Sequence, residues 1–316
     1  MVSKVSMAVD LGGIRMKNPV NTASGTFGNG WQFEGFYDVG ELGAITTKGC
    51  AAKAWDGNPA PRMCELPSGI MNSVGLQNPG VRAFVASYGE YLAGLEERGC
   101  RVICQVAGHS VEEYVRALEL FEELAPFASG FEINISCPNV SKGGAAMGKK
   151  QTVVKNINAA AAAEVMAAVR PVTKRPIVVK MAPHDVGEIA RALEAEGADA
   201  LSLINTIPGM AIDVRTRKSR LSRPTAGVSG PAIHAIAVRM VWEAHRAVDI
   251  PLCGIGGVTS GEDAAEFILA GATAVSVGTA NLVDPTAAPR VERELEAWAE
   301  SQGVSDINEL IGAFEC

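Results

Sequence analysis

Several side chains that could carry chemistry stand at the ends of short apolar runs in this sequence. They comprise two lysines, a thiol, two amides and a hydroxyl: Lys48, Asn134, Cys137, Lys180, Asn205 and Thr206. If each run is a strand of one parallel barrel, its end brings these groups to a single mouth, although they lie far apart in the sequence. A concave site built from these groups could bind a polar substrate and move a proton.

Cys137 is the candidate for the acid–base group. It stands beyond a strand end, before Pro138 and at the head of a loop with Gly143-Gly144, and such a loop can close over a substrate. A thiol has an ordinary pKa of about 8.5, which a neighbouring cation can lower. A buried structural cysteine is the alternative. We assign packing or surface roles to the other cysteines: Cys50, Cys64, Cys100, Cys104, Cys253 and Cys316.

Glycines cluster where the last two expected strands end. Gly254-Ile-Gly256-Gly257 follows one strand, Gly278-Thr279 follows the other, and Gly230-Pro231 opens the preceding helix. In barrels the loops after strands seven and eight bind phosphate through bare backbone amides. Glycines that serve only tight turns are the alternative. Together with the two lysines, they favour a phosphorylated cofactor.

Alternating strand and helix patterns position these groups. We predict strands at Val20–Ala23, Ala44–Thr47, Val102–Val106, Phe131–Ser136, Ile177–Met181, Ala200–Ile204, Pro251–Ile255 and Ala274–Val277. Helical stretches between them include Val111–Leu124, Asn156–Val169, Val186–Glu196, Pro231–Val248 and Gly261–Ala270. Eight strands in such alternation predict an α/β fold, a closed (β/α)₈ TIM barrel. A doubly wound sheet is the alternative, but it would usually need fewer strands.

The length of 316 residues exceeds the roughly 250 of such a barrel, so we expect insertions. Residues 1–20, with Gly12-Gly13 between two short alternating runs, predict an N-terminal hairpin that closes the bottom. Loop insertions are expected at residues 49–99, 139–151 and 206–230, all on the C-terminal side of strands. Because no linker divides the chain, we expect one domain over residues 1–316.

Composition excludes several classes of protein. With 47% hydrophobic residues the chain can form a large core, and a net charge of −7 argues against nucleic acid as a partner. No apolar run is long enough for a signal peptide or a membrane span. Seven cysteines without a Cys-x-x-Cys pair are typical of a reduced, cytoplasmic protein.

Metal catalysis is disfavoured, because the four histidines are scattered without ligand spacing. Of these, only His109 is expected near the mouth, and we interpret it as a hydrogen-bonded loop histidine. The basic run from Arg215 to Arg223 is typical of a solvated loop face. Because the run follows the sixth strand, a second role is open to it: it could bind an acidic partner or steer an anionic substrate to the site.

From Met7 to about Pro289 the sequence resembles the dihydroorotate dehydrogenases, an FMN-dependent family of pyrimidine biosynthesis. The matching segments are Asn21-Thr-Ala-Ser-Gly-Thr-Phe-Gly28, Thr46-Thr-Lys-Gly49, Asn72-Ser-Val-Gly-Leu-Gln-Asn-Pro-Gly80, Asn134-Ile-Ser-Cys-Pro-Asn139, Val179-Lys-Met-Ala-Pro183, Asn205-Thr206, Ser229-Gly-Pro-Ala232, Cys253-Gly-Ile-Gly-Gly257 and Val277-Gly-Thr279. The thiol at Cys137 resembles class 1. The segments Ser24–Gly28 and Ile212–Lys218 resemble subclass 1B, which uses NAD⁺ through a partner subunit carrying FAD and a [2Fe–2S] cluster.

The resemblance implies a role for each matching residue. Cys137 would remove the C5 proton of dihydroorotate while a hydride passes from C6 to flavin N5, and Lys48 would neutralise substrate and flavin charge. The substrate would be held by Lys48, Asn72, Ser73, Val74, Gly75, Leu76, Asn134, Asn139, Asn205 and Thr206. The flavin would contact Ser24, Lys48, Gly49, Gln105, Asn134, Lys180 and Ile204, and its phosphate Gly230, Gly256, Gly257, Gly278 and Thr279. Gln105 departs from the asparagine expected in many relatives.

The resemblance also implies a homodimer and a heterotetramer with the electron-transfer subunit. This chain has no iron–sulfur cysteine motif, which fits a cluster carried by another chain. The nearest alternative is a class 1A-like homodimer that reduces fumarate. Others are a related pyrimidine reductase, a flavin-dependent tRNA-modifying enzyme and an electron-relaying barrel without catalysis. The absence of a basic appended domain argues against the tRNA enzyme.

Overall fold

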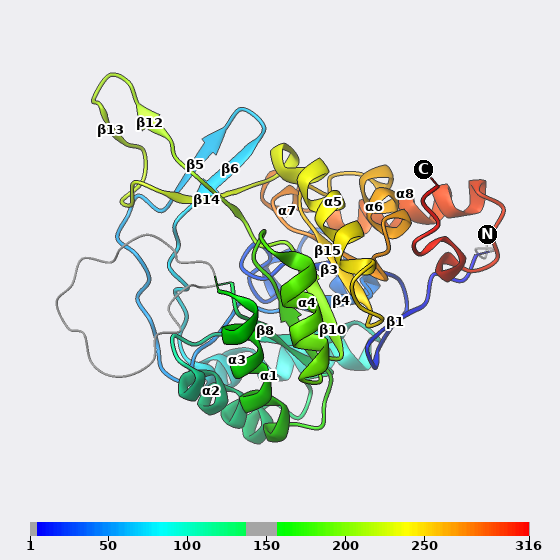
Figure 1. Cartoon of the computed structure of the whole chain (residues 1–316), viewed down its shortest axis with the longest axis horizontal. Helices are drawn as coiled ribbons and strands as arrows, with labels where there is room; N and C mark the ends of the chain where they lie inside the picture. Colours follow the sequence, from blue (N-terminus) through cyan, green and yellow to red (C-terminus); the bar gives the residue numbers. More distant parts are fainter. Residues whose placement is uncertain (1–4, 137–156, 316) are drawn as a thin grey trace.

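The computed structural model describes residues 5–136 and 157–315. Eight parallel strands form the central sheet, in the order β3-β16-β15-β10-β9-β8-β7-β4. Their bounds are β3 Val20–Thr22, β4 Ala44–Thr46, β7 Arg101–Val106, β8 Gly130–Asn134, β9 Ile177–Lys180, β10 Ala200–Leu203, β15 Leu252–Ile255 and β16 Ala274–Val277. Helices surround the sheet (Figure 1).

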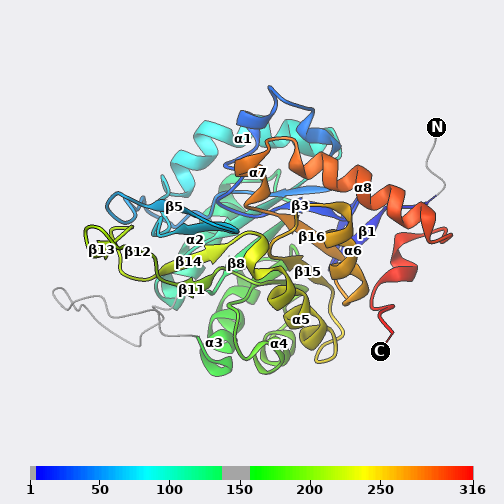
Figure 2. The same ribbon diagram turned by 90° about the horizontal axis from the view of Figure 1, so that it is seen from above.

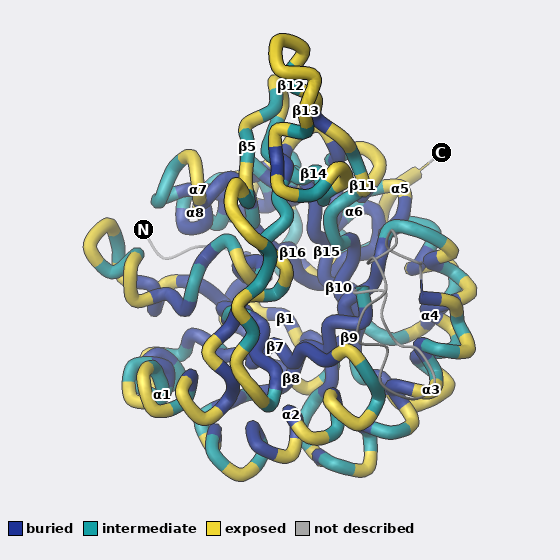
Figure 3. Tube along the Cα trace, turned by 90° about the vertical axis from the view of Figure 1, so that its left-hand side faces the viewer, coloured by how far each residue is buried: buried dark blue, intermediate teal, exposed yellow. Residues whose placement is uncertain are grey.

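Contacts between β3 and β4 close this sheet into a barrel. The amide of Gly43 donates to the Val20 carbonyl over 3.1 Å, and Asn21 Nδ2 donates to Thr46 Oγ1 over 2.8 Å. The strands are buried on both faces, which explains their almost continuously apolar sequences (Figure 3). The predicted (β/α)₈ barrel is confirmed.

The described helices follow the barrel strands. They are α1 Val81–Glu97, α2 Val111–Leu124, α3 Ala159–Val169, α4 Val186–Ala195, α5 His234–His245, α6 Gly261–Leu269, α7 Ala280–Val283 and α8 Ala287–Ser301. Short 3₁₀ turns occur at Trp31–Phe33, Val39–Glu41, Arg170–Val172, Pro231–Ile233 and Ile307–Leu310. None of the described helices is long and apolar enough to cross a membrane.

The insertion expected at residues 49–99 is not an insertion throughout. Its second part is α1, the barrel helix between β4 and β7, so only the segment up to Gly80 is additional. Gly80 with φ +81° begins this helix without a side-chain cap, which is why the sequence carries no start signal there. The helix expected from Asn156 begins later, because the Asn158 side chain accepts a hydrogen bond from the Ala161 amide.

A four-stranded antiparallel sheet lies at one end of the barrel, where the sequence analysis expected loops. It has the order β11-β14-β6-β5, with bounds β5 Met63–Leu66, β6 Gly69–Asn72, β11 Ile207–Gly209 and β14 Ala226–Ser229. A further hairpin joins β12 Ile212–Asp213 to β13 Lys218–Ser219. Two segments far apart in sequence therefore form one small sheet (Figure 2). Its strands are short and half-buried, so their apolar periodicity is weak.

A hairpin at the N-terminus lies against the opposite end of the barrel. Strands β1 Val9–Leu11 and β2 Ile14–Met16 pair antiparallel, with alternate residues buried. Gly12 at its turn has φ +62°, and a Cβ on it would lie 2.2 Å from the carbonyl oxygen of Asp199, just before β10. Only glycine allows this close approach.

Gly12→Ala should therefore lower the free energy of unfolding by about 1–3 kcal/mol, because the new Cβ meets backbone in a strained left-handed conformation. Thermal denaturation measures the change. Gly35→Ala is the matched control, since nothing lies within 4 Å of a Cβ there and its φ is not positive. Equal effects of the two substitutions would show that the hairpin does not pack as described.

Candidate active site

A cavity of about 650 Å³ opens at the carboxyl ends of the barrel strands, a volume typical of cofactor and substrate sites. The residues predicted from the sequence that line it are Ser24, Lys48, Asn72, Ser73, Val74, Gly75, Leu76, Gln105, Asn134, Lys180, Ile204, Asn205, Thr206, Gly230, Gly256, Gly257, Gly278 and Thr279. The barrel thus brings together groups that are distant in sequence. Cys137, Asn139 and the segment 139–151 lie outside the described residues.

Gly49 differs from this expectation, because it is not among the residues that line the cavity. A Cβ on Gly49 would lie 2.3 Å from Gln105 Oε1. The glycine stands behind the cavity wall and leaves room for the longer glutamine side chain. The short distance gives a steric reason why residue 49 is glycine when residue 105 is glutamine.

One end of the cavity is a glycine cradle formed by Gly230, Gly256 and Gly257, with φ of +99°, +145° and +70°. A Cβ on Gly256 would lie 2.5 Å from Ala237 Cβ, so the backbone must stay bare. Within the described parts of the chain, the backbone amides of Gly256, Gly257, Gly278 and Thr279 donate no hydrogen bond. Unpartnered amides at strand ends bind anions, phosphate above all.

His234, which the sequence analysis did not select, supports this cradle at the start of α5. Its Nδ1 lies 2.9 Å from the Gly256 carbonyl oxygen and therefore donates to it. Its Nε2 lies 3.4 Å from Glu266 Oε2 and 3.8 Å from Asp263 Oδ1, both on α6. The Nε2 atom makes no hydrogen bond within the described residues, so the histidine holds the glycine turn through Nδ1. No pattern around His234 in the sequence indicates this contact.

Lys180 also lines the cavity. It is 6% exposed and closes β9, where its register partner on β8 is Asn134. Its ammonium forms no ion pair of 4.0 Å or less with a carboxylate of residues 5–136 or 157–315. A buried cation without an anionic partner is costly, and an anionic ligand in the cavity would compensate it.

A hydrogen-bonded network forms the floor of the cavity around Glu132, which is 3% exposed. Gln105 Nε2 and Ser202 Oγ each donate to its carboxylate over 2.6 Å. Gln105 Oε1 accepts from Ser24 Oγ at 2.8 Å and from Asn134 Nδ2 at 3.4 Å. The amide of Gln105 is held in one orientation as a result. Glu132 was missed, although a charged residue within an apolar strand was a usable signal.

The other end of the cavity carries amides and hydroxyls. Asn205 Nδ2 donates to Ser136 Oγ and Ser136 Oγ donates to Asn134 Oδ1, both over 2.8 Å. Asn72 on β6 lines the same end. These groups offer both donors and acceptors to a neutral polar ring.

The backbone next to Asn72 leaves three consecutive amides unpartnered. The Ser73 amide donates to the Arg62 carbonyl over 2.7 Å, whereas those of Val74, Gly75 and Leu76 donate to none of the described residues. Gly75 and Leu76 have φ of +72° and +55°. Successive amides in such conformations form a concave anion site, which we call the 74–76 nest. Of the four residues predicted from Ser73 to Leu76, three therefore have a free backbone donor.

Other lining residues were not selected from the sequence. They include Ala23, Gly25, Thr26, Asn58, Met63, Ile70, Ser136, Ala182, Pro183, His184, Pro208, Thr225, Ala226, Gly227, Ser229, Ile233, Ile255 and Leu282. Many come from the small antiparallel sheet, which the sequence analysis treated as loops. Several of them, such as Ser136 and Ser229, stand within the matching segments, and Asn58 belongs to the turn-forming pair Gly57-Asn58.

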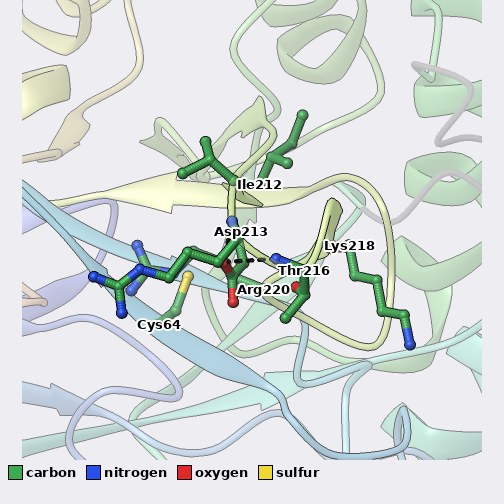
Figure 4. Close-up of a pocket in the computed structure, with 9 residues that line it drawn as sticks. Cys64, Ile212, Asp213, Thr216, Lys218 and Arg220 are labelled. Carbon is green, nitrogen blue, oxygen red and sulfur yellow. Dashed lines mark hydrogen bonds between the residues drawn. The ribbon is translucent and has the colours of Figure 1, made fainter.

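A second, more open hollow of about 620 Å³ lies at the β12–β13 hairpin (Figure 4). Asp213 Oδ1 accepts from the amides of Arg215 and Thr216, which shapes the turn and lowers the pKa of Asp213. Arg215 and Arg217 are exposed, as expected of a solvated face, but Arg223 turns inward to Asn58.

In the part of the chain that the structure describes, no cluster of His, Cys, Asp or Glu could hold a metal.

The fold and this cavity define a (β/α)₈-barrel protein whose polar mouth leaves anion-binding amides at both ends. The family model of dihydroorotate dehydrogenase matches residues 6–298, and the chain belongs to that family. It is an oxidoreductase, as expected from its motifs. Membership implies FMN as the cofactor, and the residues present fit it: the glycine cradle suits a phosphate, and Lys180 suits the anionic charge of a reduced flavin.

The chain is also similar to individual curated proteins over almost its whole length. It is 46% identical to the catalytic subunit of dihydroorotate dehydrogenase B (NAD(+)) of Pelobacter propionicus, over 99% of this chain and 100% of that protein. The subunit of the same name from Geotalea daltonii is also 46% identical, over 99% and 100%. That of Bacteroides thetaiotaomicron is 44% identical, over 98% and 99%. The expected likeness to the NAD-linked subclass is confirmed.

The described cysteines do not provide a reactive thiol at the cavity. Burial raises the pKa of Cys50 to about 12, despite the opposing charge of Lys48. Burial likewise raises the pKa of Cys100 and of Cys253 to about 12. Only Cys64 among the described cysteines is partly exposed. Because the thiolate is the nucleophile, the buried cysteines are inert near neutral pH.

Iodoacetamide at pH 8 should therefore label Cys64 in the native protein and leave Cys50, Cys100 and Cys253 unmodified. Peptide mass spectrometry after a timed quench gives the occupancy of each thiol. The same reaction in guanidinium chloride is the control and should label all of them. Rapid native labelling of Cys253 would contradict its burial in the barrel.

Proposed function

We propose that this chain oxidises (S)-dihydroorotate to orotate in pyrimidine biosynthesis, with FMN in the barrel mouth. The observation that carries the proposal is the family match over residues 6–298, together with a cavity whose two ends suit two anions. The glycine cradle suits the cofactor phosphate, and the 74–76 nest suits the substrate carboxylate. The NAD-linked names of the relatives favour this function over a fumarate-reducing alternative.

In this proposal the substrate ring is oriented by Asn72, Asn134, Asn139, Asn205 and Thr206. Their amides and hydroxyl match a ring that carries both donors and acceptors. The carboxylate accepts hydrogen bonds from the free amides of the nest. This fixes the ring at the face where the oxidation takes place.

Cys137 acts as the general base and takes the proton from C5 of the substrate. FMN, when bound, supplies the hydride acceptor. Lys180 stabilises the negative charge of the reduced flavin. Lys48 neutralises negative charge on the substrate and on the cofactor. Ser24, Gln105 and Ile204 complete the wall of the cofactor site, with Gln105 held by Glu132.

We also propose that electrons leave through a partner subunit that carries FAD and a [2Fe–2S] cluster and reduces NAD⁺. The relatives are named catalytic subunits of an NAD(+)-linked enzyme, which supports a partner. This chain would form a homodimer and, with the partner, a heterotetramer in the cytoplasm. Residues 1–316 would act as one FMN-binding domain. Copurification with a yellow-brown iron–sulfur subunit, and NAD⁺ reduction that depends on it, would test this assembly.

Anaerobic titration of the purified chain with dihydroorotate, followed by flavin absorbance, tests the first half-reaction. Bleaching of the flavin is expected. A yellow protein that does not bleach would contradict the substrate, and a protein that stays colourless and inert with added FMN would contradict the cofactor.

Cys137→Ser should retain FMN and orotate but slow flavin reduction by at least about 10²-fold, the usual contribution of a general base. Anaerobic stopped-flow absorbance measures the rate. Cys64→Ser is the control and should reduce its flavin at the rate of the unmodified chain. Normal reduction in Cys137→Ser would remove this thiol from the mechanism.

Lys180→Met should have opposite effects on the two forms of the protein. Without FMN, thermal stability should rise or stay equal, because the substitution removes a buried charge that has no ion pair among the described residues. FMN affinity should fall by about tenfold, since the anionic cofactor loses its cation. Flavin fluorescence titration measures affinity, and Lys174→Met, at an exposed lysine, is the control. Unchanged FMN affinity would contradict the role assigned to Lys180.

A further inference from the structure

Two distant segments of the chain meet behind the 74–76 nest at Asn58. The Asn58 backbone amide donates to the Val74 carbonyl over 3.0 Å. Its side-chain Nδ2 donates to the Ser73 carbonyl over 3.1 Å and to Ser73 Oγ over 2.9 Å. Every donor of Asn58 is therefore directed at the segment that carries the nest.

Arg223 holds Asn58 from the other side. The two residues are 165 positions apart, and Arg223 comes from the connection between β13 and β14. Its Nε and Nη2 donate to Asn58 Oδ1 over 3.3 Å and 3.2 Å. Because both guanidinium donors reach one oxygen, the amide of Asn58 cannot turn over. A cation on the oxygen also polarises the amide and strengthens its donors towards Ser73.

The nest itself requires this support. Leu76 has φ +55°, a conformation that side chains rarely adopt, and its carbonyl accepts from Asn78 Nδ2 at 2.8 Å. A Cβ on Gly75 would lie 2.7 Å from the Asn58 backbone nitrogen, so the loop packs directly on Asn58. A strained segment persists only where its surroundings hold it. Asn58 and Asn78 hold this one from its two ends.

We propose that Asn58 and Arg223 are positioning residues that make the nest selective for a carboxylate-bearing ring over a neutral one. Asn58 keeps the three amides pointed at one place, and Arg223 adds fixed positive charge behind them. Neither residue needs to touch the substrate. This inference rests on the proposed function. It assigns the selectivity of the site for an anionic substrate to two residues from different insertions, Asn58 before β5 and Arg223 before β14.

Arg223→Met in the FMN-loaded chain tests the pair. Flavin absorbance changes report binding of orotate and of its neutral carboxamide analogue. The dissociation constant for orotate should rise by about tenfold, while that for the carboxamide should change by less than about twofold. Arg215→Met is the matched control, an exposed cation of the neighbouring hairpin, and should leave both constants unchanged.

Asn58→Asp is the second variant, because it keeps the side-chain shape and the partner of Arg223 but replaces the two donors to Ser73. It too should weaken orotate selectively, with FMN content unchanged, since the glycine cradle proposed for the cofactor phosphate is formed by other residues, Gly230, Gly256 and Gly257. Equal weakening of both ligands, or an equal effect of Arg215→Met, would overturn the inference. An unmodified chain that holds FMN but binds neither ligand would instead contradict the proposed function.

Discussion

The buried carboxylate of Glu132 is the constraint on which the floor of the cavity depends. A charge removed from water must have its hydrogen bonds satisfied, and Gln105 and Ser202 satisfy both of its oxygens. Side chains from β7, β8 and β10 are thereby fixed relative to one another without a ligand. Gln105 in turn can offer only its carbonyl oxygen to Ser24 and Asn134. The wall is preorganised before anything binds.

Backbone amides and two lysines, Lys48 and Lys180, supply the positive groups of this cavity. Bare amides stand at the glycine cradle and at the 74–76 nest, and the side chain of Lys180 lines the same cavity. Backbone dipoles are held by the fold and need no reorganisation when an anion arrives. The guanidinium of Arg223 stands behind the wall, bound to Asn58, and acts on the site indirectly. This arrangement reconciles an acidic protein of net charge −7 with a site for anions.

The barrel strands and the cavity residues at their ends were predictable, because buried parallel strands read as apolar runs and their ends share one mouth. Naming a flavin and orotate required the family resemblance. The small sheet was not predictable, since β6 and β14 are short and half-buried and pair across the chain. Glu132 and Asn58 had local signals in the sequence, but the contacts through which they act depend on folding. No local pattern indicates the contact of His234 with Gly256. The bounds of α1 were hidden by its uncapped start at Gly80.

The pairing of Asn72 with Gly227 also has a consequence for how the protein is made. Contacts between residues so distant in sequence carry a large loop-closure entropy and form late in folding. On the ribosome, β6 emerges long before β14 and remains an edge strand until most of the barrel has been synthesised. Because β15 and β16 follow β14 in the sequence and β16 pairs with β3, closure of the barrel comes later still, and a nascent chain has the strands of its mouth before the barrel beneath them is complete.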